Sequence, residues 1–262
     1  KVRDMFDGLD CVKYYEFDSK MTLGKKRNFM HTKTKGEIIV YMDDDDYYPP
    51  CRITHAVRTL RANPKALCAG SSEIYIYFKH IQKMYQFGPY GPNHATAGTF
   101  AFRRDLLKIT KYNDNAALAE EKSFLKDYTV PFVQLDPMKT ILVFSHEHNT
   151  FDKRKMLEQP HPDFVRESSK TVSMFVKNQE SLKFFMEDID SKLAVYEPGK
   201  PDMKPDVLKQ IVELEEARRI ETEKMGGLPH DLTPEETIEM LHEQQRHIEH
   251  LVHELQKRDQ EV

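Results

Sequence analysis

The chain has 262 residues and a net charge of -4, with 31% charged and 39% hydrophobic residues. That length allows one sizeable core plus an appendage. The net negative charge argues against a nucleic-acid partner, because sequence-independent binding to phosphate backbones requires an excess of basic residues. Cys11, Cys51 and Cys68 are odd in number and lack metal-ligand spacing, which favours a reducing compartment. No apolar run approaches the roughly 20 residues of a membrane span, so we expect a cytoplasmic protein.

The first predicted elements are a short strand over 11–17 and a helix that Thr22 caps and Gly36 ends. Lys25, Lys26 and Arg27 fall in the first turn of this helix. Backbone amides at a helix start, together with three cations, are a candidate anion site. Ordinary solvated lysines would give the same pattern, and the sequence does not separate the two interpretations.

The stretch 38–42 is apolar, rich in β-branched residues, and runs directly into Asp43, Asp44, Asp45 and Asp46. Its lack of alternation predicts a central strand of a mainly parallel sheet covered on both faces. Ligands of open α/β sheets lie at the carboxyl ends of strands, and adjacent aspartates repel one another unless a hard cation compensates them. We therefore predict a Mg²⁺ or Mn²⁺ site here. The alternative is a solvated acidic turn.

The next predicted elements alternate between helices and strands, and their ranges are 51–62 (helix), 67–69 (strand), 72–78 with 81–87 (hairpin), 98–102 (strand), 116–128 (helix) and 139–144 (strand). His146 and His148 follow the last strand and would face the same way on an extended segment. Either could complete a metal shell, which would favour Mn²⁺ over Mg²⁺. Both could equally be loop histidines held by the backbone.

Several of these motifs occur in the order found in family-2 glycosyltransferases with the GT-A fold, which the chain resembles over residues 1–155. The matching residues are Arg27-Asn28, Gly36-Glu37, Asp43-x-Asp45, Pro50, the 98–103 strand with its arginine, and Ala119-Glu120-Glu121. The segments 20–28 and 146–153 are also similar to transferases of large DNA viruses, which would place the protein in the host cytoplasm. The family opens with a strand, a helix and a second strand that carries an aspartate for the nucleobase. This chain is expected to start after them.

The resemblance implies an inverting transfer of sugar from a nucleotide sugar, expected to be a UDP-sugar, to a hydroxyl of a glycan or protein. Asp45 would bind the metal, with Asp43 directly or through water and Asp44 beside them. Glu121 would be the general base, with Glu120 as its alternative, although the family usually has Asp at this position. Lys25, Lys26, Arg27 and Lys153 would contact phosphates, His146 and His148 would be the candidate further ligands, and His94 would be a weaker candidate on the acceptor side.

The last part of the chain differs in kind from the catalytic part. We expect a GT-A-like domain over 1–155, a packing helix within 156–196 that runs from 168 to 190, and a helical extension over 197–262 behind a proline-rich linker. Ile238, Leu241, Ile248, Val252 and Leu255 alternate spacings of three and four, which predicts a heptad seam. The seam could form a homo-oligomer, or its helix could lie on the domain.

Two other functions stay open at this stage. A sugar-phosphate nucleotidyltransferase also uses aspartates at a strand end, but it would carry a glycine-rich, basic signature near its start. A non-catalytic scaffold built on a transferase domain would leave the C-terminal helices as the working part. The acidic residues Asp43, Asp45 and Glu121 are all present, which argues against the second alternative.

Overall fold

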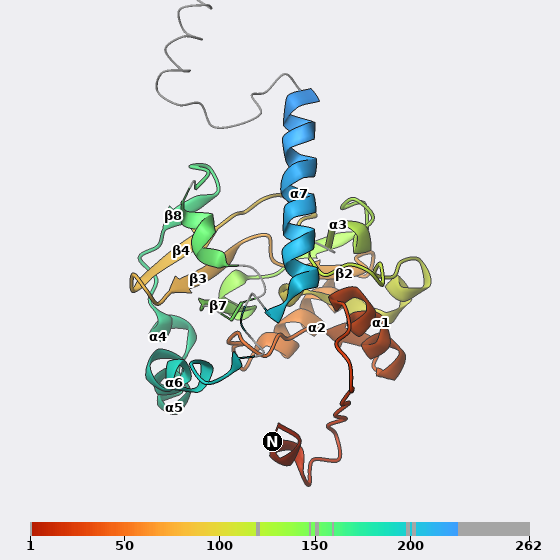
Figure 1. Cartoon of the computed structure of the whole chain (residues 1–262). Helices are drawn as coiled ribbons and strands as arrows, with labels where there is room; N and C mark the ends of the chain where they lie inside the picture. The colour runs from red at the N-terminus through yellow and green to blue at the C-terminus, as the bar shows by residue number, and fades with distance from the viewer. Residues whose placement is uncertain are drawn as a thin grey trace, which may run out of the picture. The chain divides into compact units, whose positions relative to one another are not determined.

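The computed structural model of the protein describes residues 2–118, 121–146, 148–149, 152–158, 160–197, 200 and 203–224. It has two compact units, Lys1–Leu208 and Lys209–Val262. The heptad seam over 238–255 lies outside the described residues. In the described part, no helix is both long enough and apolar enough to cross a membrane. The fold and the site described below belong to the first unit (Figure 1).

The first sheet has the strand order β1-β5-β2-β6. Its strands are β1 (Ile38–Val40), β5 (Ala101–Arg103), β2 (Cys68–Gly70) and β6 (Phe132–Gln134). Strand β5 runs antiparallel to both β1 and β2, whereas β6 runs parallel to β2. Helix α2 (Arg52–Ala62) covers this sheet and buries Ala56 and Leu60 against it. Helix α1 (Leu23–Lys33) ends shortly before β1 and buries Gly24, Arg27 and His31.

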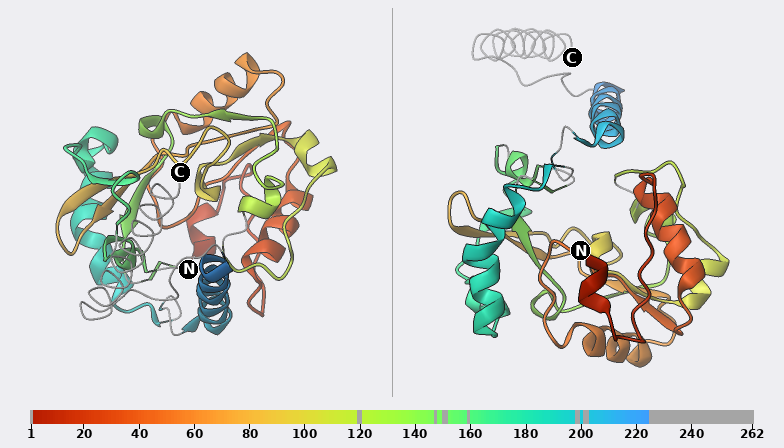
Figure 2. Two further views of the ribbon diagram at one scale, coloured as in Figure 1. Left: turned by 90° about the horizontal axis from the view of Figure 1, so that it is seen from above. Right: turned by 60° about the horizontal axis from the view of Figure 1, so that its bottom comes forward.

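The second sheet has the order β7-β3-β4-β8, with β7 at Leu142–Ser145, β3 at Ile74–Phe78, β4 at Lys83–Phe87 and β8 at Val165–Glu167. The hairpin β3–β4 is antiparallel, as the sequence predicts, and β7 lies parallel to β3. Val172 and Phe175 of helix α4 (Val172–Phe175) pack on this sheet beside Tyr75 and Phe144. Figure 2 shows α5 (Gln179–Lys183) and α6 (Ile189–Leu193) beside this sheet, away from α1.

The expectation of a mainly parallel sheet is wrong. The described strands form two mixed sheets in which two pairings are parallel and four are antiparallel. Strand β1 pairs with β5 at one end of its sheet and is not a central parallel strand. An apolar run of five residues indicates that a strand is buried, but it does not indicate whether the adjacent strand runs parallel or antiparallel. That direction depends on the path of the distant 98–103 segment. The α/β class with flanking helices is confirmed.

Several predicted elements are shorter or differently divided than expected. Segment 11–17 forms no strand, and the helix predicted over 116–128 is reduced, among described residues, to α3 (Glu121–Phe124). The helix predicted over 168–190 is divided into α4, α5 (Gln179–Lys183), a π-helical turn (Phe184–Asp188) and α6 (Ile189–Leu193). Asn178 starts α5 by accepting a hydrogen bond from the Ser181 amide. Helix α7 (Pro205–Lys224) lies within the range 197–262 for which a helical extension is predicted.

Short 3₁₀ turns join these elements, at Val2–Phe6, Ala97–Thr99, Arg104–Lys108, Pro137–Lys139 and Lys153–Leu157. The turn Ala97–Thr99 precedes β5 and contacts residues that follow β1. Its neighbour Phe100 belongs to the main aromatic core with Tyr41, Phe102 and Phe124. The turn is therefore anchored on a rigid base.

Candidate functional site

The four aspartates, which we call the acidic loop (Asp43–Asp46), follow β1 where its hydrogen bonding to β5 ends. The Tyr41 amide still donates to the Phe100 carbonyl at 2.9 Å. The Asp43 amide then donates to the Tyr48 hydroxyl at 2.8 Å, and that hydroxyl donates to the Gly98 carbonyl at 3.1 Å. The tyrosine thus ties the start of the loop to the Ala97–Thr99 turn.

Gly98 allows this close approach because it has no side chain. A Cβ atom at this position would lie 2.6 Å from Oδ2 of Asp43, well inside normal contact distance. The carboxylate of Asp43 therefore lies directly against the turn. An added methyl group would displace this carboxylate oxygen, so Gly98 permits the observed position of the Asp43 side chain.

Arg52, at the start of α2, is fully buried behind the acidic loop. Its Nη2 atom donates to the carbonyl oxygens of Thr99 at 2.7 Å and Phe100 at 3.0 Å, and it lies 3.4 Å from the Tyr41 carbonyl. Burial lowers the pKa of Arg52 to about 10, with Tyr48 acting against the shift. One cation therefore clamps the end of β1 to the start of β5, and it fixes the base of the loop.

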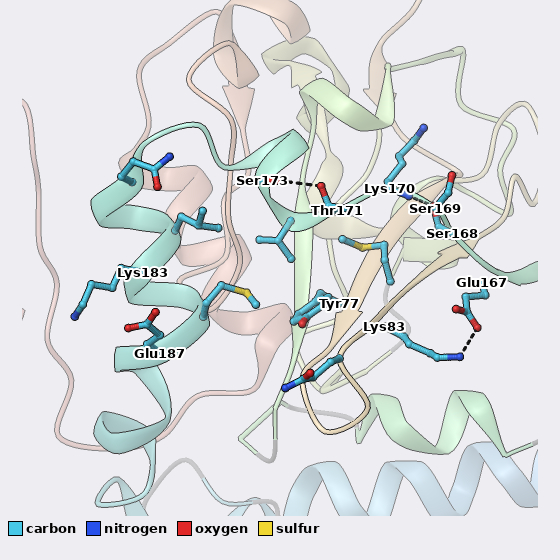
Figure 3. Close-up of a pocket in the computed structure, with 16 residues that line it drawn as sticks. Tyr77, Lys83, Glu167, Ser168, Ser169, Lys170, Thr171, Ser173, Lys183 and Glu187 are labelled. Carbon is cyan, nitrogen blue, oxygen red and sulfur yellow. Dashed lines mark hydrogen bonds and ion pairs between the residues drawn. The ribbon is translucent and has the colours of Figure 1, made fainter.

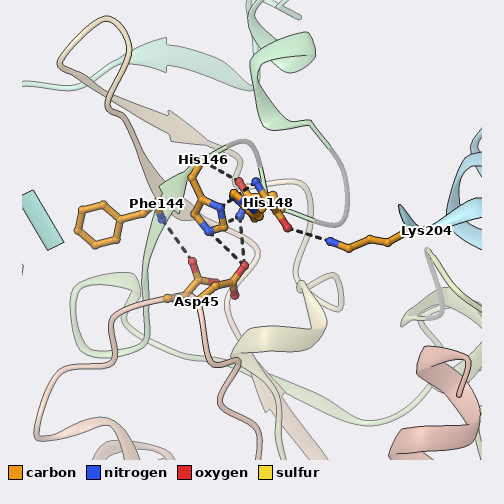
Figure 4. A network of polar contacts seen from close by, with 7 residues as sticks. Asp45, Phe144, His146, His148 and Lys204 are labelled. Carbon is orange, nitrogen blue, oxygen red and sulfur yellow. Dashed lines mark hydrogen bonds and ion pairs between the residues drawn. The ribbon is translucent and has the colours of Figure 1, made fainter. Parts of the chain in front are cut away.

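The second half of the loop meets residues that follow β7 (Figure 4). Oδ2 of Asp45 accepts from Nδ2 of Asn149 at 3.1 Å and lies 3.5 Å from Nε2 of His146. Desolvation alone would raise the pKa of Asp45, but the contact with His146 and the charge of Lys153 lower it to about 2. Asp45 is thus a carboxylate throughout the physiological range.

Asp46 is more deeply enclosed than Asp45 and accepts a hydrogen bond from the Phe144 amide at 3.3 Å. Desolvation first, and the neighbouring Asp45 charge second, raise its pKa to about 8. The pKa of Asp43 is also raised, by desolvation, while Arg27 acts in the opposite direction. A nearby positive charge would favour the ionised form of these carboxylates and lower their pKa values.

These observations bear on whether a divalent cation fits the loop. In the described part of the chain, no three His, Cys, Asp or Glu side chains are already gathered as a metal cluster. The available donors are carboxylate oxygens from Asp43 and Asp45, with the imidazole of His146 next to Asp45. Oxygen donors suit Mg²⁺ and Mn²⁺, and an added imidazole favours Mn²⁺. The donor chemistry and the raised pKa of Asp43 therefore fit a divalent cation.

His146 and His148 have different partners. The chain bends at this point instead of staying extended, and the His148 amide donates to Nδ1 of His146 at 3.2 Å. Nε2 of His148 contacts the Tyr196 carbonyl at 3.0 Å, and the side chain is buried. The extended segment assumed for these histidines is therefore absent, although their rings lie 6.3 Å apart. His146 is the one that contacts Asp45 of the acidic loop.

The basic residues of α1 have different environments. Arg27 is buried, with its guanidinium 5.2 Å from the ring centres of both Tyr41 and Tyr112. Arg27 and Lys26 are the cations that act on the pKa of Asp43, and Lys153 acts on that of Asp45. Lys25 is exposed. Three of the predicted phosphate-binding residues thus lie near the loop.

The backbone amides at the start of α1 are already satisfied within the protein. Gly24 donates to the Ala116 carbonyl at 2.9 Å, and Lys25 donates to Oγ1 of Thr22 at 3.4 Å. The Lys26 amide donates to the carbonyl of the same threonine at 3.0 Å. The predicted anion site therefore cannot use these amides as free donors. Only the side-chain charges of this predicted anion site remain available to a ligand.

Glu121 contacts the first residue of the Ala97–Thr99 turn. Its Oε1 atom accepts from the Ala97 amide at 3.1 Å. His94 is its neighbour: burial lowers the pKa of His94 while the charge of Glu121 acts to raise it, and the His94 ring lies 5.1 Å from that of Tyr128. Glu120, the predicted alternative base, lies outside the described residues.

A separate groove lies on the second sheet, between β4 and α5 (Figure 3). Its lining includes no residue of the acidic loop. Lys83 pairs with Glu167 at 2.7 Å and Lys183 with Asp188 at 2.8 Å, so these two cations are engaged within the protein. We assign no chemistry to this groove.

The sequence pattern did not single out Arg52, His31 or Asn149, and it named Asp46 only as part of the acidic run. The Arg52 signal was present, because an arginine begins the α2 pattern one turn before Ala56, on the face that is buried. His31 follows Arg27 by one turn, which places both on the same face of α1. Asn149 and Asp46 depend on tertiary contacts that local spacing does not encode.

The site thus consists of an acidic loop after a sheet strand, with cations nearby and Glu121 at the Ala97–Thr99 turn. Residues 1–119 match the sequence model of glycosyl transferase family 2, so the chain carries a domain of this glycosyltransferase family over that segment. The family implies the GT-A fold, a nucleotide-sugar donor and, commonly, a divalent metal. The comparison with curated proteins gave no match.

Proposed function

We propose that the protein is a metal-dependent, inverting glycosyltransferase that moves a sugar from a nucleotide sugar, a UDP-sugar by preference, to a hydroxyl of a glycan or protein. One observation carries this proposal. Asp43 and Glu121 approach the same Ala97–Thr99 turn, Asp43 against Gly98 and Glu121 at the Ala97 amide. A donor-side carboxylate and a candidate base therefore converge on one short segment.

The donor side is the acidic loop. Asp43 and Asp45 would hold Mn²⁺ or Mg²⁺, with Asp44 beside them, His146 adjacent to Asp45, and His148 supporting that segment from behind. The cation, when bound, supplies a Lewis acid that offsets the charge of the diphosphate. Lys25, Lys26, Arg27 and Lys153 would contact the donor phosphates, and the last three act on the pKa values of the loop carboxylates.

The acceptor side is Glu121. An acceptor hydroxyl attacks the anomeric carbon while the bond from that carbon to the diphosphate oxygen breaks on the opposite face. Glu121 takes the hydroxyl proton as this new bond forms, which is the role of a general base. The amide of Ala97 holds the carboxylate in place. His94 next to it would contact the acceptor.

The test is a turnover assay with UDP-sugars and GDP-sugars, with and without Mn²⁺, in which released nucleoside diphosphate is measured. The proposal expects metal-dependent release of nucleoside diphosphate from at least one nucleotide sugar. A parallel assay with nucleoside triphosphate and sugar phosphate measures pyrophosphate, which a nucleotidyltransferase would produce instead. Pyrophosphate release, or no turnover and no nucleotide binding in any assay, contradicts the proposal.

A further inference from the structure

The segment that leads into α7 returns to the acidic-loop side of the first unit. Tyr196 offers its carbonyl oxygen to Nε2 of His148 at 3.0 Å. Lys204 donates from Nζ to the His148 carbonyl at 2.9 Å, and His148 lies two residues after the His146 that contacts Asp45 (Figure 4). The sequence predicted a linker here, but its described residues are attached to the site.

A second set of contacts holds the same segment from the α1 side. Asp206 forms an ion pair with Lys20, which lies just before α1. Val207 is buried, with 5% of its surface exposed. Lys204 is thus positioned from both directions, by the residues after β7 and by the residues before α1. Such a two-sided attachment fixes a side chain more firmly than a surface helix end does.

The charges around Lys204 are those of the proposed donor site. Lys204 is half-buried, and burial lowers its pKa. The carboxylates of Asp45 and Asp44 act to raise that pKa, whereas Lys20 and Lys153 act to lower it. Two acidic-loop residues and two further lysines therefore lie within electrostatic range. A lysine has three N–H donors, and the His148 carbonyl takes one of them.

We propose that Lys204 binds the diphosphate of the nucleotide-sugar donor, so that a residue from beyond the family-2 domain completes the donor site. This inference rests on the proposed function. The acidic loop alone repels a diphosphate, and one divalent cation offsets only part of the combined negative charge. Lys204 and Lys153 add positive charge on the Asp45 side, while Arg27 and Lys26 add it on the Asp43 side.

The competing role for Lys204 is to fasten the chain to His148 without touching a ligand. The two roles predict different affinities for nucleotides that carry one or two phosphates. A diphosphate contact should favour UDP over UMP, because the second phosphate would meet the lysine. A fastening role should affect both nucleotides equally, through disorder of the His146 segment.

The experiment measures binding of UDP and UMP, each with Mn²⁺, by calorimetry on the full chain. The variants are Lys204→Met, Lys204→Arg and the control Lys209→Met, which removes a lysine paired with Glu213 on α7. We expect Lys204→Met to weaken UDP binding about tenfold or more, the usual scale of a charge-assisted hydrogen bond. UMP binding should change much less, and both Lys204→Arg and Lys209→Met should stay near wild type.

Equal losses for UDP and UMP in Lys204→Met, or no loss, overturn the proposal while the transferase assignment stands. A wild-type protein that binds neither nucleotide overturns both. Thermal unfolding of each variant shows whether Lys204→Met is folded. If it is not, the comparison moves to Lys204→Gln, for which the same loss confined to UDP is expected.

Discussion

The two sheets hold opposite ends of the acidic loop in different ways. On the side of the first sheet, the contact at Asp43 uses its backbone amide, which donates to Tyr48 at 2.8 Å. On the side of the second sheet, the contacts at Asp45 and Asp46 use the carboxylates themselves, with Asn149 at 3.1 Å and the Phe144 amide at 3.3 Å. One end is positioned by its backbone, and the other by its charge.

This difference divides the work between two parts of the fold. The Arg52 clamp and the tight Gly98 contact fix where the loop starts, and they would act the same with or without a ligand. The contacts with His146 and Asn149, together with the charge of Lys153, lower the pKa of Asp45 to about 2 against the effect of desolvation. A cation bound at Asp45 would meet a carboxylate that already contacts His146 and Asn149. The first sheet therefore positions the start of the loop, and the residues after β7 contact its carboxylates.

The largest expected effect is at the second-sheet end. Asp45→Ala removes a carboxylate that would bind the metal, so we expect sugar transfer and metal-dependent UDP binding to be abolished. The fold should survive, because the change relieves repulsion with Asp46 and opens no apolar cavity. Asp105→Asn, an exposed carboxylate paired with Lys108, is the control. Transfer by Asp45→Ala at the wild-type rate would remove the metal assignment.

The next effect tests the acceptor side of the turn. Glu121→Gln keeps the shape of the side chain but cannot take a proton, so turnover should fall by about 10² or more. Nucleotide affinity should change little, and Glu180→Gln on α5 serves as an exposed control. A loss seen in Glu120→Gln and absent in Glu121→Gln would transfer the role of base to Glu120.

A smaller effect tests the first-sheet end alone. Gly98→Ala places a Cβ 2.6 Å from Oδ2 of Asp43, so this carboxylate must move. We expect the concentration of Mn²⁺ required for half-maximal turnover to rise about tenfold, as for a lost charge-assisted contact. Gly91→Ala is the matched control, because its Cβ would meet nothing closer than 4.0 Å. Equal metal requirements in the two variants would show that Asp43 does not bind the cation.

The smallest effect concerns stability under α1, far from the second sheet. Burial, helped by Arg27 and Arg104, lowers the pKa of His31 to about 4 from 6.5. The neutral form is therefore favoured in the folded state. Its contribution is present above pH 6.5 and is lost as pH falls towards 4.

Chemical denaturation between pH 7 and pH 4.5 measures this contribution. The wild-type free energy of unfolding should fall by on the order of 2 kcal/mol more than that of His31→Phe, since one pKa unit is worth about 1.4 kcal/mol. The exposed His161→Phe should behave as wild type. Parallel pH profiles for the wild type and His31→Phe would contradict the buried neutral histidine.

The sequence predicted well what local spacing decides. Thr22 caps α1, the hairpin β3–β4 pairs as expected, and α2 forms close to the predicted range 51–62. It failed where distant segments decide. The antiparallel partner of β1 comes from residues 101–103, which no pattern at 38–42 can reveal. The break between α4 and α5 had a local signal in Asn178, but the apolar spacing on either side outweighed it.

The candidate site shows the same division. Placing carboxylates after a strand follows from the order of motifs, and the structure brings Asp45 to His146 and Glu121 to the Ala97–Thr99 turn. Local patterns do not reveal the contact between His148 and the Tyr196 carbonyl, which lies 48 positions away in the chain. Likewise, the burial of Arg27 depends on Tyr112, which lies on a loop that local patterns leave undefined.

The central claim, that the acidic loop binds a divalent cation together with the donor diphosphate, is tested most directly by titrating Mn²⁺ into the full chain. Electron paramagnetic resonance measures free Mn²⁺ in the presence and absence of UDP. We predict that UDP strengthens Mn²⁺ binding in the wild type, and that Asp43→Asn/Asp45→Asn removes this enhancement. Mn²⁺ binding that is the same in both proteins, with and without UDP, would contradict the account.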